Sequence, residues 1–286
     1  MRRRDMLVSA LAAGLGACAP SLGDFNALTP KDAGGALARR DIAYGAHDRQ
    51  MLDLYAPRVS PIGMPVAVFF YGGAWRSGAR DYYEFLGDAL ASRGFLTAIP
   101  DYRLAPQVRF PTFLEDCAAA VAWTSAHAAQ FGGDPNKLVL IGHAAGAYNA
   151  MMVGLDERYL RAAGADRRAL RGIAGLGGPY DFLPLNTPEM RAAFGGAGDL
   201  GATQPVHFAR RDGPPLLLMW GEKDQTVPRR SIEAMQRAAQ AVGQRVDVKI
   251  YPNTDNAGLL LDLSRLFRGN APVLDDLVAF MRRVTA

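Results

Sequence analysis

The chain has 286 residues, of which 49% are hydrophobic and 21% charged, a composition typical of a globular enzyme-sized domain. Its two cysteines exclude a disulfide framework, and its four histidines have no cysteine or carboxylate at metal-ligand spacing, so we predict no metal and no cofactor. The net charge is +4, and Arg2, Arg3, Arg4 and Asp5 contribute +2 of it, which argues against a nucleic-acid partner.

Residues 1–17 have the pattern of an export signal. Three arginines precede an apolar run over Met6–Ala17, which is shorter than the roughly 20 residues that span a bilayer. The run ends in Leu15-Gly16-Ala17-Cys18, which resembles the lipobox of bacterial lipoproteins, and the arginines also resemble a twin-arginine signal. We therefore expect Cys18 to carry a lipid that anchors the protein in the bacterial envelope, on the periplasmic side. The alternative is a chance apolar start with a free cysteine.

Residues 18–40 are rich in small residues and contain Pro20, Pro30 and Gly34-Gly35. This composition favours a tether between the anchor and the folded part of the chain. We expect a single domain over residues 41–286.

From residue 41, short β-rich runs alternate with helical stretches, a pattern that predicts an α/β fold with a mostly parallel central sheet, helices on both faces and little or no separate cap. The predicted strands are Met51–Tyr55, Val66–Tyr71, Leu96–Pro100, Leu138–Gly142, Gly172–Leu176, Leu216–Gly221 and Val246–Tyr251. The predicted helices are Tyr82–Arg93, Leu114–Gln130, a stretch from Ala145, Ser231–Val242 and Pro272–Val284.

Ligands of open α/β sheets bind beyond the carboxyl ends of the strands, so the loops at these ends are the first place to look for a site. The strand ending at Ile141 enters Gly142-His143-Ala144-Ala145-Gly146. Small residues on both sides of a central position are typical of a nucleophile elbow, a strained turn that lifts one side chain above the sheet. The central residue here is Ala144.

Three other loops carry polar or small residues at strand ends. Gly72-Gly73-Ala74-Trp75 follows the second predicted strand, where small residues let backbone amides face an oxyanion. Asp224 follows Leu216–Gly221, and Asn256 follows the last predicted strand. A turn-forming aspartate before Val227-Pro228 is the alternative interpretation of Asp224.

Three segments resemble the α/β-hydrolase superfamily, and within it the carboxylesterase and hormone-sensitive-lipase-like branch that includes kynurenine formamidases. Tyr71–Trp75 is similar to its His-Gly-Gly-x-Trp oxyanion loop, with Tyr71 in place of the histidine. Asp101–Pro106 contains the sequence Tyr-Arg-Leu-Ala-Pro of that branch, and Phe131–Pro135 is similar to the segment before its elbow strand. The resemblance covers about residues 41–284 and implies hydrolysis of a small carboxylic ester or amide.

The resemblance also implies a role for each site residue. Ala144 stands at the serine position, Asp224 at the acid position and Asn256 at the histidine position. The implied oxyanion donors are the amides of Gly73, Ala74 and Ala145, and Trp75 would contact the substrate.

Alanine offers no nucleophile, and a carboxamide is not basic near neutral pH, so two of the three triad roles are unfilled. We expect His143 to point away from Ala144, and we expect neither His127 nor His207 to replace the base.

We therefore predict an esterase scaffold without esterase activity. Such a chain is either a natural pseudoenzyme or a recently or deliberately inactivated enzyme. A second hypothesis is a non-catalytic, membrane-anchored binding protein for an ester, amide or carboxylate, and a third is a weak hydrolase that activates water directly.

Overall fold

The sheet has eight strands in the order β1-β2-β4-β3-β5-β6-β7-β8 in a computed structural model that describes residues 21–286. The strands are β1 (Gly35–Ala43), β2 (Met51–Pro57), β3 (Met64–Phe70), β4 (Leu96–Pro100), β5 (Gly133–His143), β6 (Leu170–Leu176), β7 (Leu216–Gly221) and β8 (Val246–Tyr251). The β1–β2 and β2–β4 pairs are antiparallel, and every other pair is parallel. The predicted mostly parallel sheet is confirmed, and each predicted strand overlaps an observed one.

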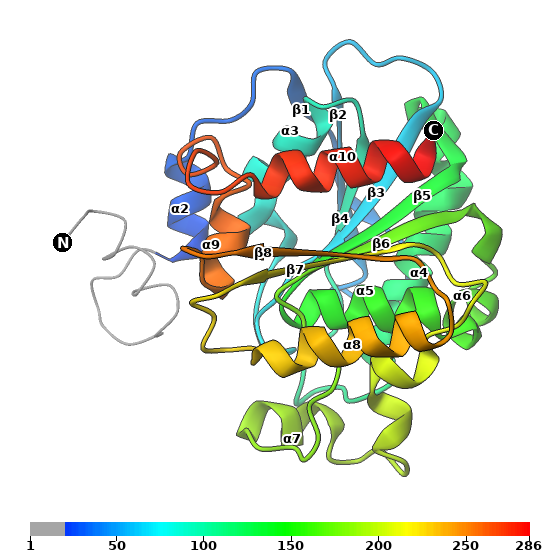
Figure 1. The fold of residues 1–286 in the computed structure, drawn as a ribbon. Coiled ribbons are helices and arrows are strands. Elements are labelled where there is room, and N and C mark those ends of the chain that lie inside the picture. The colour runs from blue at the N-terminus through cyan, green and yellow to red at the C-terminus, as the bar shows by residue number, and fades with distance from the viewer. Residues whose placement is uncertain (1–20) are drawn as a thin grey trace.

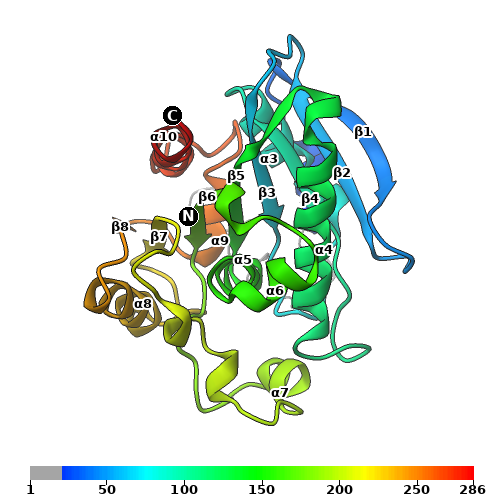
Figure 2. The ribbon, with the colours of Figure 1, turned by 90° about the vertical axis from the view of Figure 1, so that its right-hand side faces the viewer.

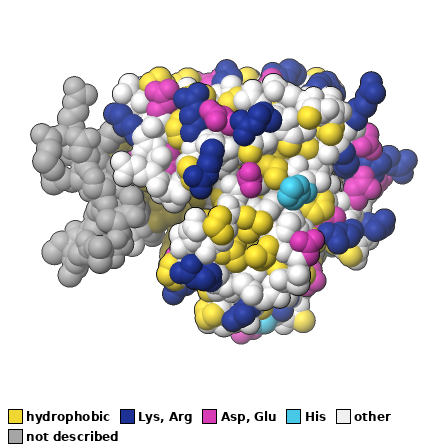
Figure 3. All heavy atoms as spheres, turned by 60° about the horizontal axis from the view of Figure 1, so that its bottom comes forward, with side chains coloured by type: hydrophobic (Ala, Val, Ile, Leu, Met, Phe, Trp, Pro, Cys, Tyr) yellow, Lys and Arg dark blue, Asp and Glu magenta, His cyan; other side chains and the backbone are white. Residues whose placement is uncertain are grey.

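Helices cover both faces of this sheet (Figures 1 and 2). One face carries α3 (Glu84–Ala91) and α10 (Val273–Thr285), and the other carries α4 (Thr112–His127), α5 (Ala145–Leu155) and α8 (Arg229–Ala241). The shorter helices are α2 (Leu22–Leu28), α6 (Glu157–Ala162), α7 (Pro188–Phe194) and α9 (Asn256–Leu261). Seen from below the sheet, hydrophobic side chains gather near the middle of the surface, with charged side chains around them (Figure 3).

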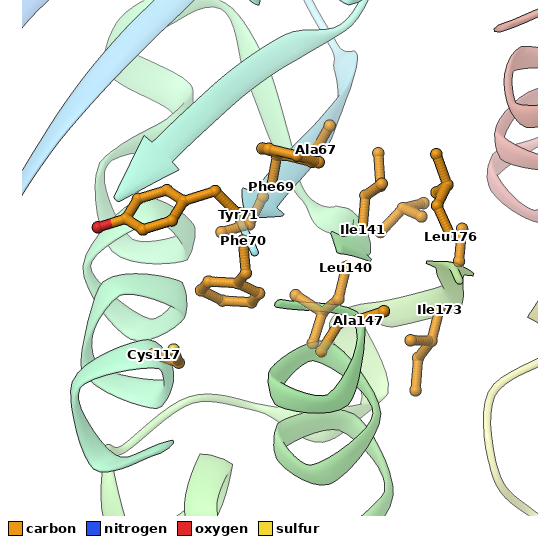
Figure 4. Close-up of a cluster of buried hydrophobic side chains, with 14 of the residues drawn as sticks. Ala67, Phe69, Phe70, Tyr71, Cys117, Leu140, Ile141, Ala147, Ile173 and Leu176 are labelled. Carbon is orange, nitrogen blue, oxygen red and sulfur yellow. The ribbon is translucent and has the colours of Figure 1, made fainter. Parts of the chain in front are cut away.

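The core consists of side chains that alternate between the two faces of the central strands. In Figure 4, Phe70 and Leu140 point toward the α4 and α5 side, whereas Phe69 and Ile141 point the opposite way. All four side chains are fully buried. A sheet buried on both faces requires continuous apolar strands, which explains why β3 and the second half of β5, from Leu138, show no polar alternation.

The predicted tether is wrong for residues 22–40, which belong to the folded domain. Helix α2 begins after Ser21, whose hydroxyl accepts a hydrogen bond from the amide of Asp24 while the Asp24 carboxylate accepts from the Ser21 amide. Phe25 of α2 is buried, and β1 adds an antiparallel strand to the sheet beside β2. The proline and glycine content of this segment therefore marks turns within the domain. The predicted export signal over residues 1–17 and Cys18 lie outside the described residues.

Candidate active site

The turn between β5 and α5 has the backbone of a nucleophile elbow. Ala144 at its apex has φ 49° and ψ −118°, a conformation that residues other than glycine rarely adopt. Two glycines permit this turn: a Cβ atom on Gly142 would lie 2.1 Å from the Gly146 oxygen, and one on Gly146 would lie 2.0 Å from the Phe70 oxygen. Ala144 is partly exposed, so a side chain at this position is accessible to a ligand.

The loop after β3 lies directly against this elbow. A Cβ atom on Gly72 would lie 3.1 Å from the Ala144 Cβ. Gly73 and Ala74 are exposed and have positive φ angles of 111° and 52°. Among the described residues, no acceptor takes a hydrogen bond from the amides of Gly73, Ala74 or Ala145. Ala145 is also the first residue of α5, where unpaired amides and the helix dipole favour an anion.

A buried polar network holds both ends of this loop. The hydroxyl of Tyr71 donates to Asp101 at 2.6 Å, and the Arg49 guanidinium donates to the Tyr71 hydroxyl at 2.7 Å and to the Gly78 oxygen at 2.9 Å. Arg80 pairs with the same carboxylate of Asp101. Tyr71, which stands at the family's usual histidine, therefore fixes the loop through its ring hydroxyl. Arg49 could not be found from the sequence, because its partners come from distant segments.

Asp224 is positioned after β7 as an acceptor of three hydrogen bonds. Its Oδ1 accepts from the amides of Thr226 at 2.8 Å and Val227 at 2.9 Å, and its Oδ2 accepts from the Asn256 side chain at 2.7 Å. Burial raises the pKa of the Asp224 carboxyl above its ordinary value, although the hydrogen bonds from Asn256, Val227 and Thr226 oppose this shift. The structure thus brings the predicted acid position and the predicted base position into direct contact.

Asn256 is presented by the first residue of α9, a helix capped by Asp255, whose side chain accepts from the Gly258 amide at 2.7 Å. Its Nδ2 donates both to Asp224 and to the main-chain oxygen of Gly177, the latter at 3.0 Å. The amide therefore makes the contact to the acid that an imidazole N–H makes in a triad. Its carboxamide is not basic near neutral pH, so it cannot take a proton from a nucleophile.

His143 lies nearer to the site than the sequence indicated. Its Nε2–H donates to the main-chain oxygen of Asn256 at 2.9 Å, and its Nδ1 would lie 3.2 Å from a Cβ atom on Gly72. The Ala144 Cβ would lie 3.1 Å from the same point, so the imidazole of His143 and the side chain of Ala144 both border Gly72. Burial lowers the pKa of His143, which keeps the ring neutral.

Trp75 is buried in an aromatic cluster rather than displayed to solvent. Its ring is 3% exposed, its Nε1–H donates to Asn149 at 3.1 Å, and Phe194 and Tyr148 pack edge-on against it at 4.8 and 5.3 Å between centroids. Its backbone belongs to the oxyanion loop, but its indole N–H already has a partner. The ring can therefore contribute an apolar wall to a ligand and no hydrogen bond.

The two remaining candidate histidines take no part in this arrangement. His127 stacks on Trp123 with centroids 4.1 Å apart, and His207 lies on the short helix Pro205–Phe208. Within residues 21–286, no group of three histidine, cysteine or acidic side chains could hold a metal ion. The helices of that part of the chain include none with the length and apolar character of a membrane span.

Comparisons with known proteins agree with this geometry. The isoprenylcysteine alpha-carbonyl methylesterase ICME of Arabidopsis thaliana is 29% identical over 84% of this chain and 61% of its own length. Esterase LipC of Mycobacterium tuberculosis is 28% identical over 86% of this chain and 65% of its own. The chain thus spans about three-fifths of the length of these curated relatives.

Solved structures share the fold. Esterase B from Lactobacillus rhamnosis, inhibited by a tributyrin phosphonate, has a TM-score of 0.82 at 19% identity and covers 100% of this chain and 97% of its own. A carbohydrate esterase from gut microbiota has a TM-score of 0.78 at 16% identity, over 90% of this chain and 99% of its own. The family model BD-FAE matches residues 52–238. The chain therefore belongs to the BD-FAE family and is an α/β-hydrolase of the carboxylesterase-like superfamily.

Proposed function

We propose that this protein recognises a small carboxylic ester, amide or carboxylate in an esterase-type site without forming an acyl-enzyme. One observation carries the proposal: Ala144 stands at the apex of the elbow while Asn256 saturates the Oδ2 of Asp224. A serine esterase needs a hydroxyl at the first position and a proton acceptor at the second. Both side chains lack the required group.

Three features support retained recognition. The amides of Gly73, Ala74 and Ala145 have no acceptor among the described residues, and the loop after β3 that carries the first two lies against the elbow that carries the third. Donors of this kind bind the oxygen of an ester carbonyl or a carboxylate whether or not a nucleophile is present. The esterase names of the curated relatives favour the same ligand class.

We further propose that Cys18 is lipidated and that the protein is held at a membrane surface of the bacterial envelope. The sequence before α2 supports this: a basic start, a short apolar run and Leu15-Gly16-Ala17-Cys18. Mass spectrometry of the membrane fraction should find a mature chain that begins with acylated Cys18. An exported chain that retains Met1 or an unmodified Cys18 would contradict this.

The catalytic half of the proposal is tested by incubating the purified protein with a fluorophosphonate probe and with p-nitrophenyl butyrate. We expect no covalent label and no burst of nitrophenol, while an active serine esterase treated in parallel gives both. Labelling within residues 138–147 would refute the proposal. Steady turnover without labelling would instead favour the weak hydrolase that activates water directly.

A further inference from the structure

A cavity of about 300 Å³ adjoins the oxyanion loop on the side of α2. We call it the α2 cavity. Backbone of Gly72 and Gly73 forms one part of its wall, and Leu22, Tyr82, Leu260 and Leu261 form another. The cavity therefore has a polar end at the Gly73 amide, Ser77 and His143, and an apolar end between α2 and α9.

This division predicts the shape of a ligand. A carbonyl or carboxylate oxygen at the exposed Gly73 amide leaves the rest of the molecule facing leucine and tyrosine side chains. Hydrocarbon is the chemistry that such a wall favours, and each methylene group taken from water strengthens binding up to about fourfold. The α2 cavity fits an unbranched chain better than a sugar or a charged group.

The surface formed by α2 and the segments that contact it carries three exposed hydrophobic side chains. Leu28 at the end of α2 is 80% exposed, Leu266 is 52% exposed and Tyr82 is 38% exposed. Leu266 belongs to this surface because its neighbour Phe267 stacks on Phe25 of α2 at 5.9 Å, and Tyr82 belongs to it because its ring lies against Gly23. Only seven large hydrophobic side chains are exposed within the described residues, and Leu28, Leu266 and Tyr82 are three of the seven.

The position of α2 in the chain indicates what this surface faces. Leu22, which lines the cavity, follows Cys18 by four residues, and four residues span at most about 14 Å. A lipid on Cys18 would therefore hold α2, α9 and the mouth of the cavity close to the bilayer. In Figure 1, α2 and α9 lie together at the end of the molecule where the chain enters the fold.

We propose that the α2 cavity holds the hydrocarbon chain of an amphiphilic ester, amide or carboxylate that resides in the membrane to which Cys18 anchors the protein. The inference rests on the ligand class proposed above and adds its chain length and its source. The exposed leucines and Tyr82 contact the lipid surface, so that such a molecule passes from the bilayer to the oxyanion amides without crossing water.

The binding test uses the full chain with Cys18→Ser, which is studied without detergent. Methyl butyrate and methyl octanoate compete for the site against the fluorescent probe methyl 11-(dansylamino)undecanoate. We expect methyl octanoate to compete at a concentration at least about tenfold lower than methyl butyrate, because it buries more methylene groups.

Two matched variants test where the hydrocarbon chain of the ligand binds. Ala257 lines the α2 cavity and is partly exposed, and Ala119 is an equally partly buried alanine in a separate groove of about 530 Å³ between α4 and α6. Ala257→Phe should weaken probe binding about tenfold or more, whereas Ala119→Phe should leave it within about twofold. The thermal unfolding of both variants is measured first to establish that they fold.

The outcomes separate this inference from the proposed function. If methyl butyrate binds and methyl octanoate binds no more tightly, the hydrocarbon site is refuted and the ester site stands. If neither ester binds, both fail. Loss of probe binding in Ala119→Phe and not in Ala257→Phe would place the hydrocarbon chain in the groove between α4 and α6 and overturn the inference.

The membrane contact is tested with the lipidated protein in phosphatidylcholine vesicles that contain a doxyl-labelled lipid. A fluorescent maleimide is attached at Leu28→Cys or, as the control, at Ile62→Cys, which replaces a side chain 98% exposed on the β2–β3 connection. The remaining thiol of the folded part, Cys117, is buried. We expect quenching at position 28 and not at 62, and equal quenching at both positions or quenching at 62 alone would overturn the proposed orientation.

Discussion

The turn between β5 and α5 and the turn between β8 and α9 lack their catalytic side chains with opposite physical consequences. At the first turn Ala144 keeps φ 49° and ψ −118°, although it has no hydroxyl to present. At the second, Asn256 donates to Asp224 and to the Gly177 oxygen, so both N–H groups of its side-chain amide have an acceptor. The first turn keeps a strained backbone without a hydroxyl, and the second has its hydrogen bonds satisfied without a basic side chain.

The comparison shows that the backbone of the site does not depend on the catalytic side chains. The elbow is fixed by the close approach of Gly142 to Gly146 and of Gly146 to Phe70, and the oxyanion loop is fixed by Tyr71, Asp101 and Arg49. None of these contacts involves the side chain of Ala144 or Asn256. A site built in this way can keep its backbone geometry when its catalytic side chains change, and we expect that two substitutions suffice to test its chemistry.

The largest expected effect is the return of esterase activity in the double variant Ala144→Ser, Asn256→His. Triad members act as a unit, so we expect turnover of p-nitrophenyl butyrate to rise at least about a thousandfold over the unchanged protein, while each single variant stays near background. The rate should rise with pH as the new histidine loses its proton. Initial rates of the protein and the three variants provide the measurement.

Adding Asp224→Asn to the active double variant is the matched control, because it removes the carboxylate that holds the histidine tautomer and should return turnover to about the level of the single variants. A correctly folded double variant that remains as inert as the single variants would show that the elbow and the acid turn no longer share one reaction geometry. The binding role would then be the function of the site.

The fold and the identity of the site residues could be predicted because their signals are local. The elbow glycines, the Gly72-Gly73 loop and the acid after a strand are each read within a few neighbouring residues. The pairing of Asp224 with Asn256 could be predicted only through the resemblance, because 32 residues separate them in the chain.

The sequence could not predict features that depend on contacts between distant segments. The hydrogen bond from His143 to Asn256 joins residues 113 positions apart. The hydrogen bond from Arg49 to the Gly78 oxygen joins the residues before β2 to the end of the oxyanion loop. The helix over Leu22–Leu28 was missed for a different reason: prolines and glycines outweighed its capping residues and the single buried Phe25. Tertiary packing, rather than amino-acid composition, determines the helical structure of this segment.

The rigidity of the elbow predicts a large loss of stability in Gly146→Ala. The added Cβ would lie 2.0 Å from the Phe70 oxygen and 2.5 Å from the Tyr71 oxygen, both of which are backbone atoms that cannot move alone. We expect the free energy of unfolding to fall by about 3 kcal/mol or more, measured by urea denaturation. Gly198→Ala, where nothing lies within 4 Å of the added atom, is the control. Equal free energies of unfolding for the two variants would show that the backbone of the elbow can move to accommodate the added Cβ atom.

His143, which joins the two turns, predicts a pH-dependent contribution to stability. Burial lowers the pKa of its folded-state imidazole, with hydrogen bonds to Asn256 and the charge of Asp255 acting in the opposite direction. A group with a lowered folded pKa stabilises the fold above its unfolded pKa of about 6.5, and this stabilisation is lost as the pH falls toward the folded pKa.

We therefore expect the free energy of unfolding to fall below pH 6.5 by up to about 1.4 kcal/mol per pH unit from this residue. His143→Gln should make the decline between pH 7 and 5 shallower than in the unchanged protein. Parallel slopes in the protein and in His143→Gln would show that the ring accepts a proton without disturbing its contact with Asn256.

The smallest expected effect tests the strain at Ala144 directly. An alanine at φ 49° and ψ −118° is disfavoured by about 1–3 kcal/mol, because its Cβ crowds the backbone, whereas glycine adopts this conformation freely. Part of the gain in Ala144→Gly is offset, since glycine gains about 0.5–1 kcal/mol of conformational entropy in the unfolded chain. We expect a net rise of about 1 kcal/mol in the free energy of unfolding, measured by urea denaturation.

The control, Ala150→Gly in the middle of α5, should lower stability by about that amount or more, because its backbone is ordinary helix and its side chain is buried. If Ala144→Gly also destabilises the protein, the elbow stores no strain, and the two turns differ only in the chemistry that they lack.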